Sequence, residues 1–181
     1  MARTLAERMI GAAMLDVSVY EEVEADEGAT GQAVMVVAIV AIAGAIGAWG
    51  DGGNGMTGAV VSAFLKWLIW AGLTWFIGTR FFGGTATYGE LLRTLAFAMS
   101  PGVLLILGFV PILGWLVGAG VAIWMLVAGV IAIRQALDFD TGKAVATAVI
   151  GWAIMWAFVL TVLATFFGAA LLGMGLAGVF G

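Results

Sequence analysis

Residues 94–133 read TLAFAMSPGVLLILGFVPILGWLVGAGVAIWMLVAGVIAI, a run of 40 positions without a charged side chain. A membrane-spanning helix needs about 20 apolar residues, so this run is long enough for two spans in succession. Pro111 stands near its middle, and proline removes a helical hydrogen bond and restricts the residue before it. The sequence therefore predicts spans at about 94–110 and 115–133, joined by a turn at residues 110–114.

The first of these two spans is interrupted again at Ser100-Pro101-Gly102. The piece that remains, residues 103–110, is about 12 Å long at the α-helical rise. We therefore expect this span to be kinked or broken at Pro101. Broken helices form ion sites in transporters, but a kink satisfied by neighbouring helices is the interpretation that we favour.

Three further apolar stretches predict spans at about 33–49, 58–79 and 145–167, with a glycine-rich loop at 50–55. The apolar, glycine-rich tail 168–181 is expected to extend the last helix or lie against the bundle. The predicted fold class is all-α, a polytopic integral membrane protein. A membrane domain of five transmembrane helices, 29–181, follows a short amphipathic and acidic helical segment, 1–28.

The composition agrees with lipid as the solvent of this chain. Hydrophobic residues make up 64% and charged residues 10%, against about 45–50% and about 25% in soluble domains. The chain has no cysteine and no histidine, which removes disulfides, thiolate nucleophiles and the commonest metal ligand. We expect no enzymatic activity, no cofactor and no metal. Most of the net charge of −4 comes from residues 16–27, so nucleic-acid binding is not expected.

The segment before the first span holds seven acidic residues, which does not fit a signal peptide, so we expect the first span to remain in the mature protein. Helical periodicity predicts an N-terminal amphipathic helix with Leu5, Met9, Ala12 and Ala13 on one face. It predicts a second short helix at about Ser18–Glu24. The second turns Val19, Tyr20 and Val23 toward the membrane or the bundle. This segment is either a solvated entry to the first span or a docking surface for a cytoplasmic partner.

The basic residues predict an orientation, because lysine and arginine are enriched on the cytoplasmic side of membrane proteins. Six of the seven fall in the N-terminal segment, the second-to-third loop region or the fourth-to-fifth loop: Arg3, Arg8, Arg80, Arg93, Arg134 and Lys143. With five spans, this places the N-terminus in the cytoplasm and the C-terminus outside. The expected location is a bacterial inner membrane.

Lys66 is the one charge inside a predicted span, which makes it a candidate functional residue. Its four-carbon stem allows the ammonium to reach the interface, and we favour this over a substrate or proton role. Glu90 and Arg93 are spaced to pair on one helix face. Gly114 and Gly118 form a GxxxG motif. Glycine- and alanine-lined helices of this kind pack closely, either within the bundle or against other membrane proteins or further copies of the chain.

The order of features resembles the Yip (Ypt-interacting protein) domain family, in its bacterial branch. The resemblance rests on five segments: ERMIGA at 7–12, LDVSVYEEVE at 15–24, ATGQA at 29–33, YGELLRTLAFAMSP at 88–101 and VPILG at 110–114. It implies five membrane helices, a cytoplasmic N-terminus and no enzymatic activity. Eukaryotic members bind prenylated small GTPases, but their Asp-Leu-x-Gly-Pro signature is absent here, where residues 15–19 read LDVSV.

Three classes of function are therefore open. The first is a membrane scaffold or adaptor. The second is an accessory subunit of a larger inner-membrane complex (photosynthetic, respiratory or secretory). The third is a small transporter or channel. The scarcity of polar side chains in the spans argues against the third class. A partner that co-purifies in fixed stoichiometry would favour the second class over the first.

Overall fold

In a computed structural model, the described residues 3–48, 55–110 and 112–180 form helices joined by short connections, with the side chains of 166–180 left undescribed. The all-α prediction is confirmed for these residues. The elements in chain order are α1 (Leu5–Ala13), α2 (Val17–Ala25), η1 (Glu27–Ala29), α3 (Thr30–Gly47), α4 (Gly55–Phe82), α5 (Tyr88–Ala98), η2 (Ser100–Phe109), α6 (Leu113–Ala136) and α7 (Thr141–Phe180). Most of the predicted loop at 50–55 and the predicted turn residue Pro111 lie outside the described residues.

Four helices of the described chain, α3, α4, α6 and α7, are long and apolar enough to cross a membrane. The α5 and η2 helices form a bent pair at 42° to each other, which makes a fifth crossing if the pair is one span. The polytopic helical fold is therefore confirmed, and the expected break at Pro101 lies at the first turn of η2.

The piece after this break differs from the expectation in its helix type. η2 is a 3₁₀ helix over ten residues, although runs of more than 3–4 residues are uncommon in this conformation. At about 2.0 Å per residue its ten residues span about 20 Å, against about 15 Å for the same ten residues in an α-helix. The stretch therefore reaches further across the bundle than its residue count suggested.

η2 packs between α3 and α6. Its close approach to α3 requires a glycine, because a Cβ at Gly47 would overlap the backbone carbonyl of Leu105. The buried core extends from this contact through the facing sides of α5 and α6, with Leu91, Phe97 and Ile133 among its larger members. The 3₁₀ segment is therefore an internal part of the bundle.

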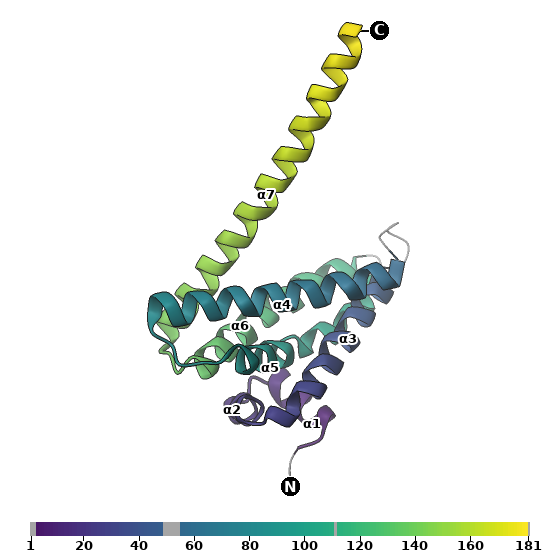
Figure 1. Ribbon diagram of the computed structural model, residues 1–181. Coiled ribbons are helices and arrows are strands. Elements are labelled where there is room, and N and C mark those ends of the chain that lie inside the picture. The colour runs from purple at the N-terminus through teal and green to yellow at the C-terminus, as the bar shows by residue number, and fades with distance from the viewer. Residues whose placement is uncertain (1–2, 49–54, 111, 181) are drawn as a thin grey trace.

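The last helix leaves the bundle, as Figure 1 shows. α7 contacts α4 and α6, and the last of its buried residues in the described side chains is Gly151. The helix continues to Phe180, so the tail after residue 167 extends it. Its 40 residues span about 60 Å, twice the apolar thickness of a bilayer.

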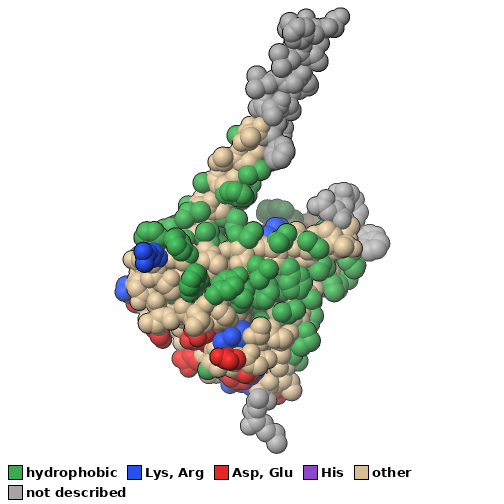
Figure 2. Space-filling model, in the orientation of Figure 1, with side chains coloured by type: hydrophobic (Ala, Val, Ile, Leu, Met, Phe, Trp, Pro, Cys, Tyr) green, Lys and Arg blue, Asp and Glu red, His purple; other side chains and the backbone are tan. Residues whose placement is uncertain are grey.

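The acidic side chains in view gather at one end of the molecule (Figure 2). Figure 2 shows acidic side chains together at the lower end of the face in view, below a broad band of hydrophobic ones. Figure 1 places α1 and α2 at this end, beneath α5. This separation of charge from the apolar surface is expected of a protein whose helices cross a bilayer.

Candidate functional site

The two N-terminal helices are fixed by side-chain caps that the sequence encodes locally. Thr4 and Glu7 form a capping box at the start of α1. Asp16 caps α2 by accepting a hydrogen bond from the Ser18 backbone amide at 3.0 Å. Caps of this kind satisfy amide groups that have no partner inside the helix. They define two short helices that turn their apolar faces toward the bundle.

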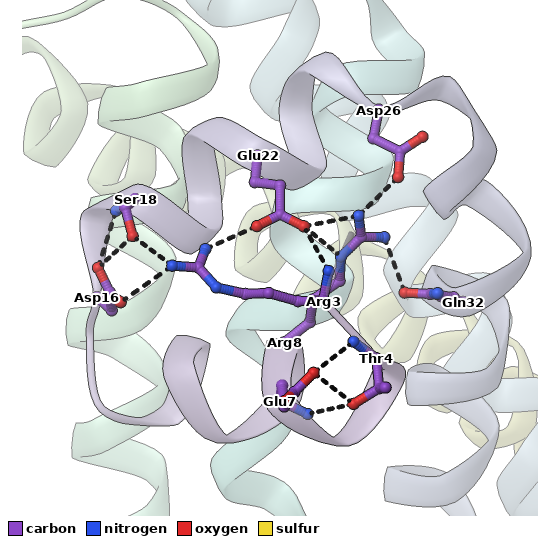
Figure 3. A network of polar contacts seen from close by, with 9 residues as sticks. All are labelled: Arg3, Thr4, Glu7, Arg8, Asp16, Ser18, Glu22, Asp26 and Gln32. Carbon is purple, nitrogen blue, oxygen red and sulfur yellow. Dashed lines mark hydrogen bonds and ion pairs between the residues drawn. The ribbon is translucent and has the colours of Figure 1, made fainter. Parts of the chain in front are cut away.

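Arg8 lies at the centre of a polar network between these helices (Figure 3). Only 2% of its side chain is exposed. Its Nη2 lies 2.8 Å from Oε1 of Glu22 and 2.7 Å from Oδ2 of Asp26, and its Nη1 donates to Oε1 of Gln32 at 2.9 Å. Arg3 reaches Glu22 from the other side, with Nη1 2.7 Å from Oε2. One buried guanidinium therefore ties α1 to α2 and to the first turn of α3.

The electrostatics of this network favour the charged forms of its members. Burial acts to lower the pKa of Arg8, but the hydrogen bonds to Asp26 and Glu22 outweigh it and the pKa is raised. The pKa of Asp26 is lowered, chiefly by its hydrogen bond from Arg8. The pKa of Glu22 is also lowered, because hydrogen bonds from Arg8 and Arg3 outweigh its burial. The network is therefore ionised at neutral pH.

Tyr20, a predicted site residue, is buried within this structure. Its hydroxyl donates to the carbonyl oxygen of Ala12 at 2.9 Å, and burial raises its pKa. Val19 and Val23 are buried beside it. The sequence left two directions open for these side chains, the membrane or the bundle, and in the structure they face the bundle. The N-terminal helices are consequently packed on their inner side, and a fully solvated entry segment is not what forms.

The expected pair between Glu90 and Arg93 does not form. Glu90 instead completes a capping box with Thr87 at the start of α5. Arg93, which is buried, donates from Nε to the carbonyl oxygen of Val23 at 2.8 Å and from Nη2 to the carbonyl oxygen of Glu24. These carbonyls lie in the last turn of α2, where a cation is favoured by the helix dipole and by unpaired backbone acceptors.

Glu24 lies where several negative groups converge. Its own burial, followed by the charges of Asp138, Glu90 and Glu21, raises its pKa to about 7, and Arg93 acts in the opposite direction. The pKa of Glu24 therefore lies near neutral pH. The sequence interpretation did not single out Glu24 or Arg8, because both depend on contacts between separate helices.

Hydrogen bonds join three segments that are distant in sequence at this end of the bundle. Gln135 at the end of α6 donates to Oε1 of Glu21 on α2 at 3.0 Å. Thr85, before α5, donates to Oδ2 of Asp138, after α6, at 2.9 Å. The N-terminal segment, the connection before α5 and the connection after α6 thus meet on one side of the molecule.

Lys66 lines a cavity of about 510 Å³ between helices of the bundle. α3, α4, α5, η2 and α6 all contribute to its wall. The lining is apolar apart from Lys66 and Ser62, and it includes the indoles of Trp67 and Trp70. Trp67 is held in place because its Nε1 donates to the carbonyl oxygen of Leu92 at 3.0 Å.

A family model described as Yip1 domain matches residues 17–164. The chain belongs to the Yip1 domain family. No curated protein and no solved structure matches it. The resemblance that the sequence segments indicated is therefore confirmed.

The Yip1 domain of this chain contains the remaining predicted residues. Pro101 is buried in the first turn of η2, and Pro111 lies outside the described residues. A Cβ on Gly114 would overlap the carbonyl oxygen of Gly108, whereas one on Gly118 would meet nothing within 4 Å. The two glycines of the GxxxG motif therefore differ: Gly114 serves a contact inside the Yip1 domain, and Gly118 does not.

The capping boxes of this Yip1 protein have a local signal in the sequence. Thr4 and Glu7, and Thr87 and Glu90, each follow the Thr-x-x-Glu pattern of a helix start. This pattern assigns Glu90 to the cap, which leaves Arg93 free to reach another element. The partner of Arg93, 70 positions earlier in the chain, had no such local signal.

Proposed function

We propose that this Yip1-domain protein is a non-enzymatic membrane scaffold or adaptor that organises other membrane proteins through α7. The observation that supports this is the departure of α7 from the bundle after Gly151 (Figure 1). A helix that packs on its neighbours for only about three turns leaves most of its length for other contacts. Aromatic side chains such as Trp152, Trp156 and Phe158 are exposed along it.

The composition of the end of α7 fits such contacts. Glycines recur in its sequence at positions 168, 173, 175 and 178, and small residues allow helix backbones to approach closely in lipid. The occupant of this surface is another membrane protein or a second copy of the chain. An accessory subunit of a larger inner-membrane complex is the second candidate, since a free apolar helix is also suited to a permanent subunit contact.

We further propose that the polar end carrying α1 and α2 faces the cytoplasm of a bacterial inner membrane, with the C-terminus outside. The support is that the N-terminal segment and the 83–87 and 137–140 connections meet at one end, and the basic residues concentrate there. The exposed acids Glu7, Asp16, Glu21 and Glu27 then form a surface open to cytoplasmic proteins.

Native mass spectrometry after extraction in mild detergent tests the proposed role. A scaffold gives complexes with several partners or with a second copy, in proportions that change with detergent. An accessory subunit gives one partner in fixed stoichiometry. A chain that is always monomeric, even after crosslinking in intact membranes, would contradict both roles.

The proposed orientation is tested by cysteine labelling, because the natural chain has no cysteine. Ser18 is an exposed position of α2. Ser18→Cys is expected to react with a membrane-impermeant maleimide only after the cells are opened. Labelling of Ser18→Cys in intact spheroplasts would reverse the orientation.

A further inference from the structure

The cavity beside α4 combines an apolar wall with a single positive charge. Small residues of α3 and α4 form much of the wall, among them Ala41, Gly44, Ala59 and Ala63. Its volume of about 510 Å³ falls within the range of ~300–1,000 Å³ that is typical of sites for small ligands. The shape and chemistry are those of a site for an apolar chain.

Lys66 is the only charged side chain among the described residues that line the cavity. The hydroxyl of Ser62 donates to the carbonyl oxygen of Ala59 at 2.9 Å, which leaves Lys66 as the charged donor for a bound anion. Of the five elements that form the wall, only α5 contains a carboxylate, that of Glu90, and this carboxylate accepts from the Thr87 backbone amide at the start of α5. No carboxylate of the described residues lies within ion-pair distance of the Lys66 ammonium.

The depth of Lys66 makes this charge unusual. Eleven positions separate it from Gly55, where α4 begins, or about 16 Å at the α-helical rise. Sixteen positions separate it from Phe82, where α4 ends. The side chain is exposed, and Lys66 lies in the inner part of an apolar helix rather than at either end. Charges at such depth are costly and face cavities or partners.

We propose that this cavity binds a long-chain fatty acid, with the carboxylate at Nζ of Lys66 and the acyl chain along the small residues of α3. Charge complementarity selects an anion, and the apolar wall selects a hydrocarbon chain. A single-chain acid has one anionic group and one hydrocarbon chain, which match the one lysine and the volume of about 510 Å³ better than the two chains of a phospholipid. Met99 and Met125 line the wall and adapt readily to a flexible chain.

Quenching of tryptophan fluorescence by dibromostearate tests the proposal, with the full chain in phosphatidylcholine nanodiscs. Trp67 and Trp70 line the cavity, so bromine atoms on a bound chain quench them. The wild type is expected to show saturable quenching. Lys66→Met is expected to weaken binding about tenfold or more, as for the loss of a hydrogen bond to a charged group. Lys66→Arg keeps the charge and should retain binding.

Lys143→Met is the matched control, because it removes a lysine that does not line the cavity and should leave binding unchanged. Equal quenching of the wild type and Lys66→Met, or quenching that never saturates, would overturn the proposal. So would Lys66-dependent quenching by a brominated phosphatidylglycerol that exceeds the quenching by dibromostearate, since a phospholipid would then be the occupant.

A second measurement uses the unmodified chain and does not depend on how Lys66→Met folds. A fatty acid with a photoreactive diazirine on its chain is crosslinked to the wild type, and the adducts are mapped by mass spectrometry. Adducts within residues 40–48 or 59–70 support the cavity as the site. Adducts confined to α7 or to other lipid-facing surfaces would contradict it.

Discussion

Arg93 of α5 donates a hydrogen bond of 2.8 Å from Nε to the carbonyl oxygen of Val23, in the last turn of α2. A second bond from the same guanidinium reaches the carbonyl of Glu24. A buried cation from the membrane bundle thus completes a short helix that precedes it by 70 positions. The contact makes the N-terminal segment a part of the folded domain.

Loss of this contact should detach α2. Arg93→Met removes a charged donor from two backbone carbonyls, and hydrogen bonds to charged groups contribute ~1.5–3 kcal/mol. Amide hydrogen exchange in α2 is expected to accelerate about 10- to 100-fold.

Glu90→Gln is the control for this prediction, because glutamine still completes the capping box with Thr87. It should not accelerate exchange in α2, because loss of its charge only relieves the repulsion that it exerts on Glu24. An equal acceleration by Glu90→Gln would mean that Glu90 and Arg93 act as a pair, as their spacing first indicated.

The buried Arg8 should contribute more to stability than its neighbour Arg3. Arg8 is 2% exposed and Arg3 is 37% exposed, yet both lie within 2.8 Å of Glu22. Arg8→Met leaves Glu22 and Asp26 without their shared partner and is expected to cost about 1–3 kcal/mol. Arg3→Met is expected to cost about 0–1 kcal/mol, as for other solvent-exposed ion pairs.

Reversible unfolding in mixed detergent micelles measures both changes in the free energy of unfolding. Far-ultraviolet circular dichroism confirms that each variant retains its helices. Equal losses for Arg8→Met and Arg3→Met would show that burial of the guanidinium has no special effect.

Glu24 should make docking of α2 pH-dependent. Its folded-state pKa of about 7 lies above the ordinary value of 4.5. As the pH rises, Glu24 therefore loses its proton at a lower pH when α2 is undocked than when α2 is docked. Stability from docking is then full below about pH 4.5 and declines as the pH rises toward 7. The chain has no histidine, the side chain that ordinarily titrates in this range.

Protection of α2 from protease, compared between pH 5 and pH 8, measures the effect against Glu24→Gln. The wild type should be less protected at pH 8, and the variant should change little over the same range. At lower pH the sign reverses, because the depressed pKa values of Asp26 and Glu22 cause their contribution to be lost on protonation. A wild type and variant with the same pH dependence would rule out Glu24 as the titrating group.

The two glycines of the GxxxG motif should respond differently to alanine. Gly114→Ala places a methyl group against the rigid backbone of Gly108 and is expected to destabilise the fold by about 1–3 kcal/mol. Gly118→Ala meets open space and should be neutral or stabilising by up to about 1 kcal/mol. Melting temperatures of the two variants in one detergent compare them, and the reverse order would mean that η2 and α6 pack differently.

The spans could be predicted from the sequence because long uncharged runs have one stable solution in lipid. The break at Pro101 followed from proline's missing donor. The partners of Arg8 and Arg93 could not be predicted, since they lie on other helices and depend on how α1 and α2 dock. The cavity at Lys66 also depends on packing, because the sequence places the lysine in a span without showing which helices surround it.

The central proposal, that α7 contacts another protein, is tested most directly by photocrosslinking in native membranes. A benzoylphenylalanine at Leu160 of α7 is compared with one at Ile69 of α4, side chains that are 59% and 53% exposed. The account predicts a discrete protein adduct from position 160 and none from position 69. No protein adduct from position 160, or the same adducts from both positions, would contradict it.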